Sequence, residues 1–368
     1  MYKRLFTLFS FIICAFIFSF SAYAIDVSAK GAVLIECDSN DIVYSKNANM
    51  RLPMASTTKI MTALVAIENC DDLEKIIKIP RCATGIEGSS IYLHENEELT
   101  ISDLLYALML ESANDSAVAL AYATCGDLDK FVDLMNEKAS ELGLENTHFT
   151  NPHGLDNDEH YTTAYELGII ASYAMNNPVF SEIVSTYKRT IPLNNGEGTR
   201  VLVNHNRLLR SYQGAIGIKT GFTKKCGRCL VSCAEVDGAR FVCVTLNAPN
   251  DWNDHKEMLD YGFSKYESVR LADVGDYVLS LDLINGVKSN VLCSNFDSLR
   301  ITLEKENINI SARVEYDRLL FAPINQNDVV GKIVFYNNDK EIGSLKLYAL
   351  ETVKNINYKK SLFERLFG

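Results

Sequence analysis

Residues 56–67 read STTKIMTALVAI, in which a serine and a lysine stand three positions apart at the start of an apolar run. The run predicts a buried helix over 56–68, and residues three apart on a helix share one face, so the Ser56 hydroxyl and the Lys59 ammonium can touch. A serine hydroxyl becomes a strong nucleophile only when a neighbouring base takes its proton. Lysine is such a base where burial lowers its pKa. The segment therefore predicts an activated serine.

A second serine and lysine three apart, Ser185 and Lys188, show how easily so short a pattern arises. This copy has no apolar continuation and runs into Pro192, which a helix interior does not accept. We therefore expect it at the surface.

Two further polar motifs follow the first in the chain. Ser112 and Asn114 flank one alanine at the end of an apolar helical stretch and offer a hydroxyl and an amide. Lys219 and Thr220 end a predicted strand and can clasp a carboxylate, while Gly221 lets a substrate backbone lie close. The three motifs in this order match the set found in class A β-lactamases and penicillin-binding proteins, with Ser-Ala-Asn at 112–114 in place of Ser-Asp-Asn, a change that keeps the two polar ends.

The chain resembles the D-alanyl-D-alanine carboxypeptidases, low-molecular-mass penicillin-binding proteins that trim peptidoglycan stem peptides. The resemblance is carried by MASTTKIMT at 54–62, ESAND at 111–115, TNPHGL at 150–155 and GIKTGFT at 217–223. It implies a penicillin-binding/β-lactamase-like fold, removal of the terminal D-Ala from stem pentapeptides, and covalent inhibition by β-lactam antibiotics. It implies no metal and no organic cofactor.

The resemblance also implies a role for each matching residue. The catalytic residues would be Ser56 as acylated nucleophile, Lys59 as general base, and Ser112 and Asn114 as proton relay and substrate orienters. The substrate-binding residues would be Lys219, Thr220, Gly221 and Phe222. The oxyanion hole would use the backbone N–H groups of Ser56 and Phe222.

Two rival functions have sequence features that would distinguish them. A class A β-lactamase needs a separate glutamate for the deacylating water, usually in a Glu-x-x-Leu-Asn segment, and the sequence has no such segment. A non-catalytic penicillin-binding sensor would tolerate loss of Ser56, Lys59 or Lys219, and all three are present. A nucleic-acid partner is disfavoured by the net charge of −11, since such proteins normally present a basic face.

The first 24 residues predict a signal peptide. Lys3 and Arg4 precede the apolar run 5–20, and Ala-Tyr-Ala at 22–24 supplies the small residues of a cleavage site. An uncleaved membrane anchor is the alternative, because the run approaches spanning length. Either way, the rest of the chain is expected to be exported.

The remainder divides into three parts by pattern. The catalytic domain, 25–265, is predicted to be α+β, with helices gathered on an antiparallel sheet. Its expected hairpin spans 32–44, its helices 101–123, 128–142 and 163–174, and its later strands 190–192, 215–219, 228–234 and 240–246. Short alternating strands predict a small all-β domain over 266–350.

The last part, 351–368, predicts an amphipathic helix. Its apolar residues are Val353, Ile356, Leu362, Phe363, Leu366 and Phe367, and its basic ones Lys354, Lys359, Lys360 and Arg365. Such a helix suits an anionic membrane surface and would hold the enzyme peripherally at the outer face of the cytoplasmic membrane, beside the cell wall. The alternative is a terminal helix packed on its own domain.

Two groups of residues, one of histidines and one of cysteines, contain metal-ligand residue types, but their pattern along the chain is not that of a metal site. His148, His153 and His160 lie in a loop without the tight spacing of a zinc site, which disfavours a metal site, and the family resemblance implies a structural loop instead. Cys226, Cys229 and Cys233 resemble a Cys-x-x-Cys signature, but Cys229, Val231 and Cys233 alternate along one strand, which predicts that they are buried apolar residues. The nine cysteines after residue 24 are predicted to be mostly free thiols.

Overall fold

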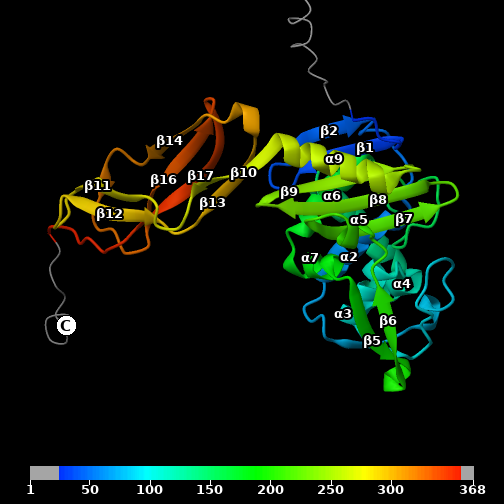
Figure 1. Cartoon of the computed structure of the whole chain (residues 1–368). Coiled ribbons are helices and arrows are strands. Elements are labelled where there is room, and N and C mark those ends of the chain that lie inside the picture. Colours follow the sequence, from blue (N-terminus) through cyan, green and yellow to red (C-terminus); the bar gives the residue numbers. More distant parts are fainter. Residues whose placement is uncertain (1–24, 358–368) are drawn as a thin grey trace, which may run out of the picture.

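The computed structural model describes residues 25–357, so the predicted signal peptide and the tail residues 358–368 lie outside the described residues. The described chain forms a helix-and-sheet domain followed by an all-β domain (Figure 1). This arrangement confirms the α+β fold class predicted from the sequence. Within residues 25–357, no helix has the length and apolar content needed to cross a membrane.

The first domain is built on a five-stranded antiparallel sheet of order β2-β1-β9-β8-β7. Its strands are β1 (Gly31–Glu36), β2 (Ile42–Lys46), β7 (Ala215–Thr223), β8 (Gly227–Val236) and β9 (Ala239–Leu246). The predicted hairpin is β1 and β2, and a turn at Asp237-Gly238 joins β8 to β9. β7, which carries Lys219, is an edge strand of this sheet.

Helices cover both faces of this sheet. Alternate residues of β1 enter two different cores: Val33 and Ile35 belong to the large helical core, and Ala32 and Leu34 to a smaller core. The helices on the large core are α2 (Lys59–Glu68), α3 (Ile101–Leu110), α4 (Asn114–Cys125), α5 (Leu128–Glu141), α6 (Ala164–Met175) and α7 (Pro178–Ser185). The short α8 (Leu208–Ser211) leads into β7.

The other face is covered by α9 (Asp251–Lys265), a helix that the sequence pattern does not predict. Charged residues dominate this segment, and Met258 and Leu259 are its fully buried apolar side chains. A helix that covers a sheet with so narrow an apolar face gives little periodic pattern.

The predicted helix over 101–123 is wrong in one respect, because the chain forms two helices there. α3 ends at Leu110 and α4 starts at Asn114, and Ser112 between them has φ = 60°. A left-handed residue interrupts a right-handed helix, so the polar motif lies in a turn.

Two small ribbons complete the domain: β3 (Ile76–Lys78) with β4 (Glu98–Thr100), and β5 (Lys188–Leu193) with β6 (Gly198–Val203).

The second domain contains a six-stranded sheet of order β14-β16-β17-β12-β11-β15 and a ribbon of β10 and β13. Their bounds are β10 (Tyr266–Ala272), β11 (Val278–Ile284), β12 (Asn290–Asn295), β13 (Leu299–Glu304), β14 (Ile310–Glu315), β15 (Leu320–Phe321), β16 (Val329–Asn337) and β17 (Lys340–Ala349). Val291, Ile333, Phe335 and Leu347 are among the side chains of its separate core.

The start of the predicted amphipathic tail needs correction. Residues 351–357 run along the second domain, where Val353 exchanges backbone hydrogen bonds with Ile324 at 2.8 and 3.0 Å. The Val353 side chain is fully buried in the core of the domain. The Val353 side chain therefore cannot face a membrane, because it packs in the core of the second domain.

Candidate active site

Ser56 lies in a 3₁₀ turn, η1 (Ala55–Thr58), that leads directly into α2. The Thr58 hydroxyl donates to the Ala55 carbonyl at 2.7 Å and so holds the turn. The predicted helix therefore begins one turn later than the sequence indicates. The Ser56 side chain stays half-buried at the start of this helix, and Lys59 is its first residue.

Lys59 is fully buried and makes three polar contacts. Its Nζ lies 3.0 Å from Ser56 Oγ, 2.7 Å from Asn114 Oδ1 and 2.6 Å from the His153 carbonyl oxygen. A neutral amine has two N–H groups and one lone pair. The Asn114 and His153 oxygens can take the two N–H groups of a neutral Lys59, and the Ser56 hydroxyl, which accepts from the ammonium form, can then donate to the lone pair.

Burial lowers the pKa of Lys59 well below its usual value, and the nearby Lys219 ammonium lowers it further, while Asp115 opposes both effects. Desolvation penalises an ammonium because the charged form loses its hydration. The site therefore makes the unprotonated amine, the form that a general base needs, easier to reach than it is for an exposed lysine.

Asn114 reaches Lys59 from the start of α4. Its Nδ2 donates to the Glu87 carbonyl at 2.5 Å, so the amide orientation that points Oδ1 at Lys59 is fixed. A Cβ on Gly88 would lie 2.7 Å from Asn114 Nδ2, and Gly88 has φ = 91°. Only glycine fits there without displacing the amide. Ser112 is buried in the same turn.

Asp115, in α4, binds the loop that contains Ser90 and Leu93. Its carboxylate is fully buried and accepts from Ser90 Oγ at 2.6 Å and from the Leu93 backbone N–H at 3.0 Å. The position of Asn114 is therefore held from both sides, by the loop and by the helix.

Lys219 projects from β7 and is almost fully buried, with its Nζ 3.0 Å from the Thr220 carbonyl oxygen. Burial lowers the pKa of Lys219 to about 7, while the Glu111 carboxylate acts in the opposite direction. Glu111 itself accepts from the Val203 backbone N–H at 2.6 Å. A cation of this kind gains strongly from an incoming carboxylate.

Gly221 brings β7 against the serine turn. A Cβ at Gly221 would lie 3.1 Å from the Ser56 backbone nitrogen and 3.2 Å from that of Thr57. The next residue, Phe222, has an exposed side chain. The edge strand β7 and the Ser56 turn therefore lie side by side.

The histidine loop packs on the serine turn. A Cβ on Gly154, where φ = 88°, would lie 2.0 Å from the Ala55 carbonyl oxygen, so this contact requires glycine. His160 Nε2 lies 2.7 Å from Thr58 Oγ1, and burial lowers the pKa of His160 to about 3. Within residues 25–357, no group of three or more His, Cys, Asp or Glu residues is arranged to hold a metal ion. The predicted structural loop also supplies the His153 carbonyl to Lys59.

The nine cysteines of the described chain are free thiols. Cys229 and Cys233 are fully buried along β8, as predicted. Cys226 Sγ lies 3.1 Å from Cys229 Sγ and 2.9 Å from the Pro53 carbonyl oxygen, just before the serine turn. The contact with Cys229 and burial raise the pKa of the Cys226 thiol, which keeps it protonated and unreactive.

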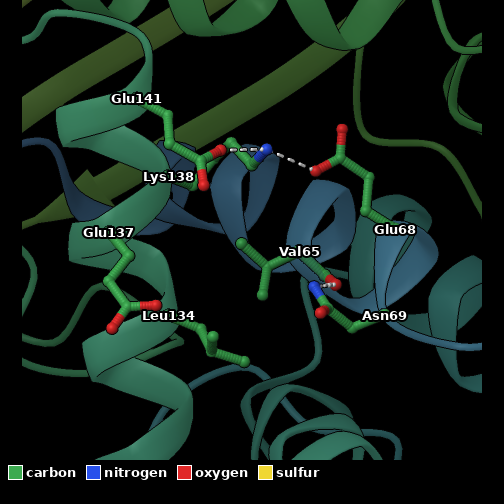
Figure 2. A pocket seen from close by; sticks show the side chains of 7 residues that line it. All are labelled: Val65, Glu68, Asn69, Leu134, Glu137, Lys138 and Glu141. Carbon is green, nitrogen blue, oxygen red and sulfur yellow. Dashed lines mark hydrogen bonds and ion pairs between the residues drawn. The ribbon is translucent and has the colours of Figure 1, made fainter.

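A cavity of about 230 Å³ lies between α2 and α5 (Figure 2). Lys138 bridges Glu68 at 2.9 Å and Glu141 at 2.6 Å across its rim. These charges satisfy one another, and the cavity includes none of the candidate site residues.

The structure brings Ser56, Lys59 and Asn114 into direct contact and places Gly221 beside them. Ser185 and Lys188 are exposed, as predicted for the second serine–lysine pair. Sequence reasoning missed the carbonyls of Glu87 and His153, because a backbone acceptor leaves no residue-type signature.

The family model described as D-alanyl-D-alanine carboxypeptidase matches residues 18–250, and that described as the C-terminal domain of penicillin-binding protein 5 matches 266–355. The chain is 32% identical to D-alanyl-D-alanine carboxypeptidase DacF of Bacillus subtilis, over 90% of this chain and 87% of the relative. It is 29% identical to DacA of Escherichia coli, over 93% and 89%.

Among solved structures, penicillin-binding protein 5 of Haemophilus influenzae is 28% identical, with a TM-score of 0.70. The match covers 90% of this chain and 98% of that one. Both domains therefore have counterparts in one known protein, in the same order.

Proposed function

The chain belongs to the D-alanyl-D-alanine carboxypeptidase family, and on that premise we propose that Ser56 is the residue its substrate acylates. The protein is a serine-type carboxypeptidase of the penicillin-binding class that acts on peptidoglycan. One observation carries the assignment of residues: the buried Lys59 Nζ lies 3.0 Å from Ser56 Oγ and is held there by two further acceptors, Asn114 Oδ1 and the His153 carbonyl.

The proposed reaction begins when Lys59 takes the Ser56 proton and Oγ attacks the carbonyl between the last two D-Ala residues. The backbone N–H groups of Ser56 and Phe222 stabilise the oxyanion, a role supported by the close approach of β7 to the serine turn. The proton held by Lys59 passes through the Ser112 hydroxyl to the departing D-Ala amine, with Asn114 orienting the substrate. Water then hydrolyses the acyl-enzyme.

Lys219 and Thr220 are proposed to bind the terminal carboxylate of the substrate, with Gly221 giving the peptide access to the strand edge. A stem peptide laid along β7 would extend the sheet, as peptides do at free edges. A β-lactam, with its own carboxylate beside a reactive carbonyl, would occupy the same positions and acylate Ser56.

We expect Lys219→Gln to lower kcat/KM for a D-Ala-D-Ala peptide about 10- to 150-fold, by loss of one charge-assisted contact. Because the pKa of Lys219 is about 7, its charged form declines as the pH rises through neutrality. The wild-type kcat/KM should therefore fall on the alkaline side, and this fall should vanish in Lys219→Gln.

A substrate amidated at its C-terminus serves as the control. It should be poor for the wild type and little affected by Lys219→Gln. Equal sensitivity of both substrates to the substitution would contradict carboxylate binding by Lys219.

The rival functions lack support. No Glu-x-x-Leu-Asn segment supplies a β-lactamase deacylation base, and a sensor would not need Lys59 buried against Ser56. Release of D-Ala from diacetyl-Lys-D-Ala-D-Ala, measured beside the intact mass with benzylpenicillin, tests the proposal. Steady turnover together with a single covalent adduct is expected, and an adduct without turnover would indicate a sensor.

We also propose that the enzyme is exported and attached peripherally to the outer face of the cytoplasmic membrane. The signal-peptide pattern at 1–24 and the basic, apolar residues of 358–368 support this location. A chain ending at Asn357 keeps Val353 in its core, so it should retain full activity on the small peptide.

The same truncated chain should bind anionic vesicles at least about tenfold more weakly than the full mature chain, because the tail's basic residues contribute about 1 kcal/mol each near such a surface. Vesicle co-sedimentation measures this. Equal binding by both chains would refute the tail as an anchor.

A further inference from the structure

Five large apolar side chains are exposed together at one end of the second domain. They are Ile284, Val287, Leu319, Phe321 and Ile356, and they are between 37% and 64% exposed. We refer to them as the apolar tip. Isolated exposed apolar residues are ordinary on soluble proteins, but a contiguous group of this kind marks an interaction surface.

Strand pairing brings the first of these residues together. β15 pairs in parallel with the end of β11, with Phe321 in register with Ile284. Register partners in neighbouring strands point to the same face, so these two side chains lie side by side. Their neighbours Leu281 and Leu283 point inward to the core, which leaves Ile284 outside by alternation.

The last described residues join the same end. Ile356 donates its backbone N–H to the Asn285 carbonyl at 2.7 Å, and Val287 donates to the Lys354 carbonyl at 2.9 Å. The hairpin turn after β11 and the final segment of the chain are thus held together. Figure 1 shows the described chain ending beside β11 and β12, at the end of the second domain that lies away from the first.

The chemistry of this end suits a bilayer surface. Charged residues of both signs stand near the tip residues in the sequence, with Asp282, Asp317 and Glu351 beside Lys288, Arg318 and Lys354. The tip is formed by a turn and strand ends. Binding at the boundary between headgroups and acyl chains grows with the apolar area that is buried there, and the tip offers five large apolar side chains.

The residues that follow the apolar tip indicate what binds to it. Residues 358–368 start directly after the tip and carry Lys359, Lys360 and Arg365 against Glu364, a net charge of 3 − 1 = +2. Four of their residues, Leu362, Phe363, Leu366 and Phe367, are large and apolar. A surface that binds this tail is brought close to the apolar tip, because Ile356 belongs to the tip and stands two residues before 358.

We propose that the apolar tip inserts into the interfacial layer of an anionic phospholipid bilayer, beside the tail. This inference rests on the proposed peripheral membrane location. The folded domain would then make its own lipid contact, so attachment at two adjacent points fixes the end of the second domain against the membrane.

A fluorescent reporter at the tip tests this in the full mature chain. The chain has a single tryptophan, Trp252, in the first domain, so Leu319→Trp adds one signal that can be separated by difference. With phosphatidylglycerol/phosphatidylcholine vesicles, the emission of the introduced tryptophan should shift to the blue. Phosphatidylcholine brominated on the acyl chains should quench it. Ile310→Trp is the matched control, exposed on β14 at the opposite sheet edge, and should show neither effect.

A second variant measures the contribution to binding. Leu319→Asp combined with Phe321→Asp should weaken vesicle binding of the full chain at least about tenfold, the effect of about 1.4 kcal/mol. D-Ala release by each variant should equal that of the wild type, which separates this proposal from the proposed activity.

Two results would overturn the inference. A Leu319→Trp chain that co-sediments with vesicles while its tip reporter stays unquenched would show attachment through the tail alone. A reporter already shielded without vesicles, and exposed when the chain ends at Asn357, would show that the tail itself covers the tip.

Discussion

Replacing Ser56 with alanine is expected to abolish both D-Ala release and covalent labelling by benzylpenicillin. Loss of the nucleophile should reduce turnover by about four orders of magnitude or more, since no acyl-enzyme can form. The fold should survive, because the Ser56 side chain is half-buried and its hydroxyl contacts only the Lys59 amine among the hydrogen bonds described. Intact mass and a D-Ala assay measure the two losses, and a thermal melt checks the fold.

Ser185→Ala is the matched control, since it removes the serine of the other serine–lysine pair. Its hydroxyl donates to the Glu182 carbonyl at 3.0 Å, at the exposed end of α7. Both activities should remain near wild type. If this substitution abolished labelling and Ser56→Ala did not, the assignment of the nucleophile would be wrong.

Lys59→Arg is expected to be inactive although it keeps the positive charge. The pKa of a guanidinium is above about 12, so arginine cannot accept the Ser56 proton near neutral pH. Loss of a general base costs about 10²- to 10⁴-fold, to be measured as the rate of acylation by benzylpenicillin.

Because Lys59 is fully buried, a larger side chain can disturb the fold, and Lys59→Ala provides a second test. This variant should be equally slow but partly rescued by added methylamine, which can occupy the vacated space as a neutral base. Acylation at a near wild-type rate in a folded Lys59→Arg variant would move the base role elsewhere, with Lys219 the first suspect.

The sequence predicted the part of the site that depends on side-chain type. Serine and lysine at a spacing of three, together with Asn114 of the second motif, identify groups that the structure brings within hydrogen-bonding distance. The sequence could not predict how the lysine is oriented, because the Glu87 and His153 carbonyls belong to the backbone. Gly88 and Gly154 stand next to these two carbonyl residues in the sequence. The structure shows that both glycines have positive φ and close contacts.

The bounds of an element could be predicted where the element buries one apolar face. They could not be predicted where apolar residues surround the element or where few of its residues are apolar. α5 follows its predicted range closely because it has one apolar face and a capping aspartate, Asp127. The break between α3 and α4 was missed because apolar residues continue on both sides of it. The end of the second domain was misjudged at Val353, where one buried side chain looks the same in sequence as one that faces lipid.

The location of the penicillin adduct tests the central claim most directly. The mature protein would be labelled with benzylpenicillin, digested, and the modified peptide sequenced by mass spectrometry. We predict one adduct, on Ser56, in the peptide that also contains Lys59. An adduct on Ser112, Ser185 or any other residue would contradict the account.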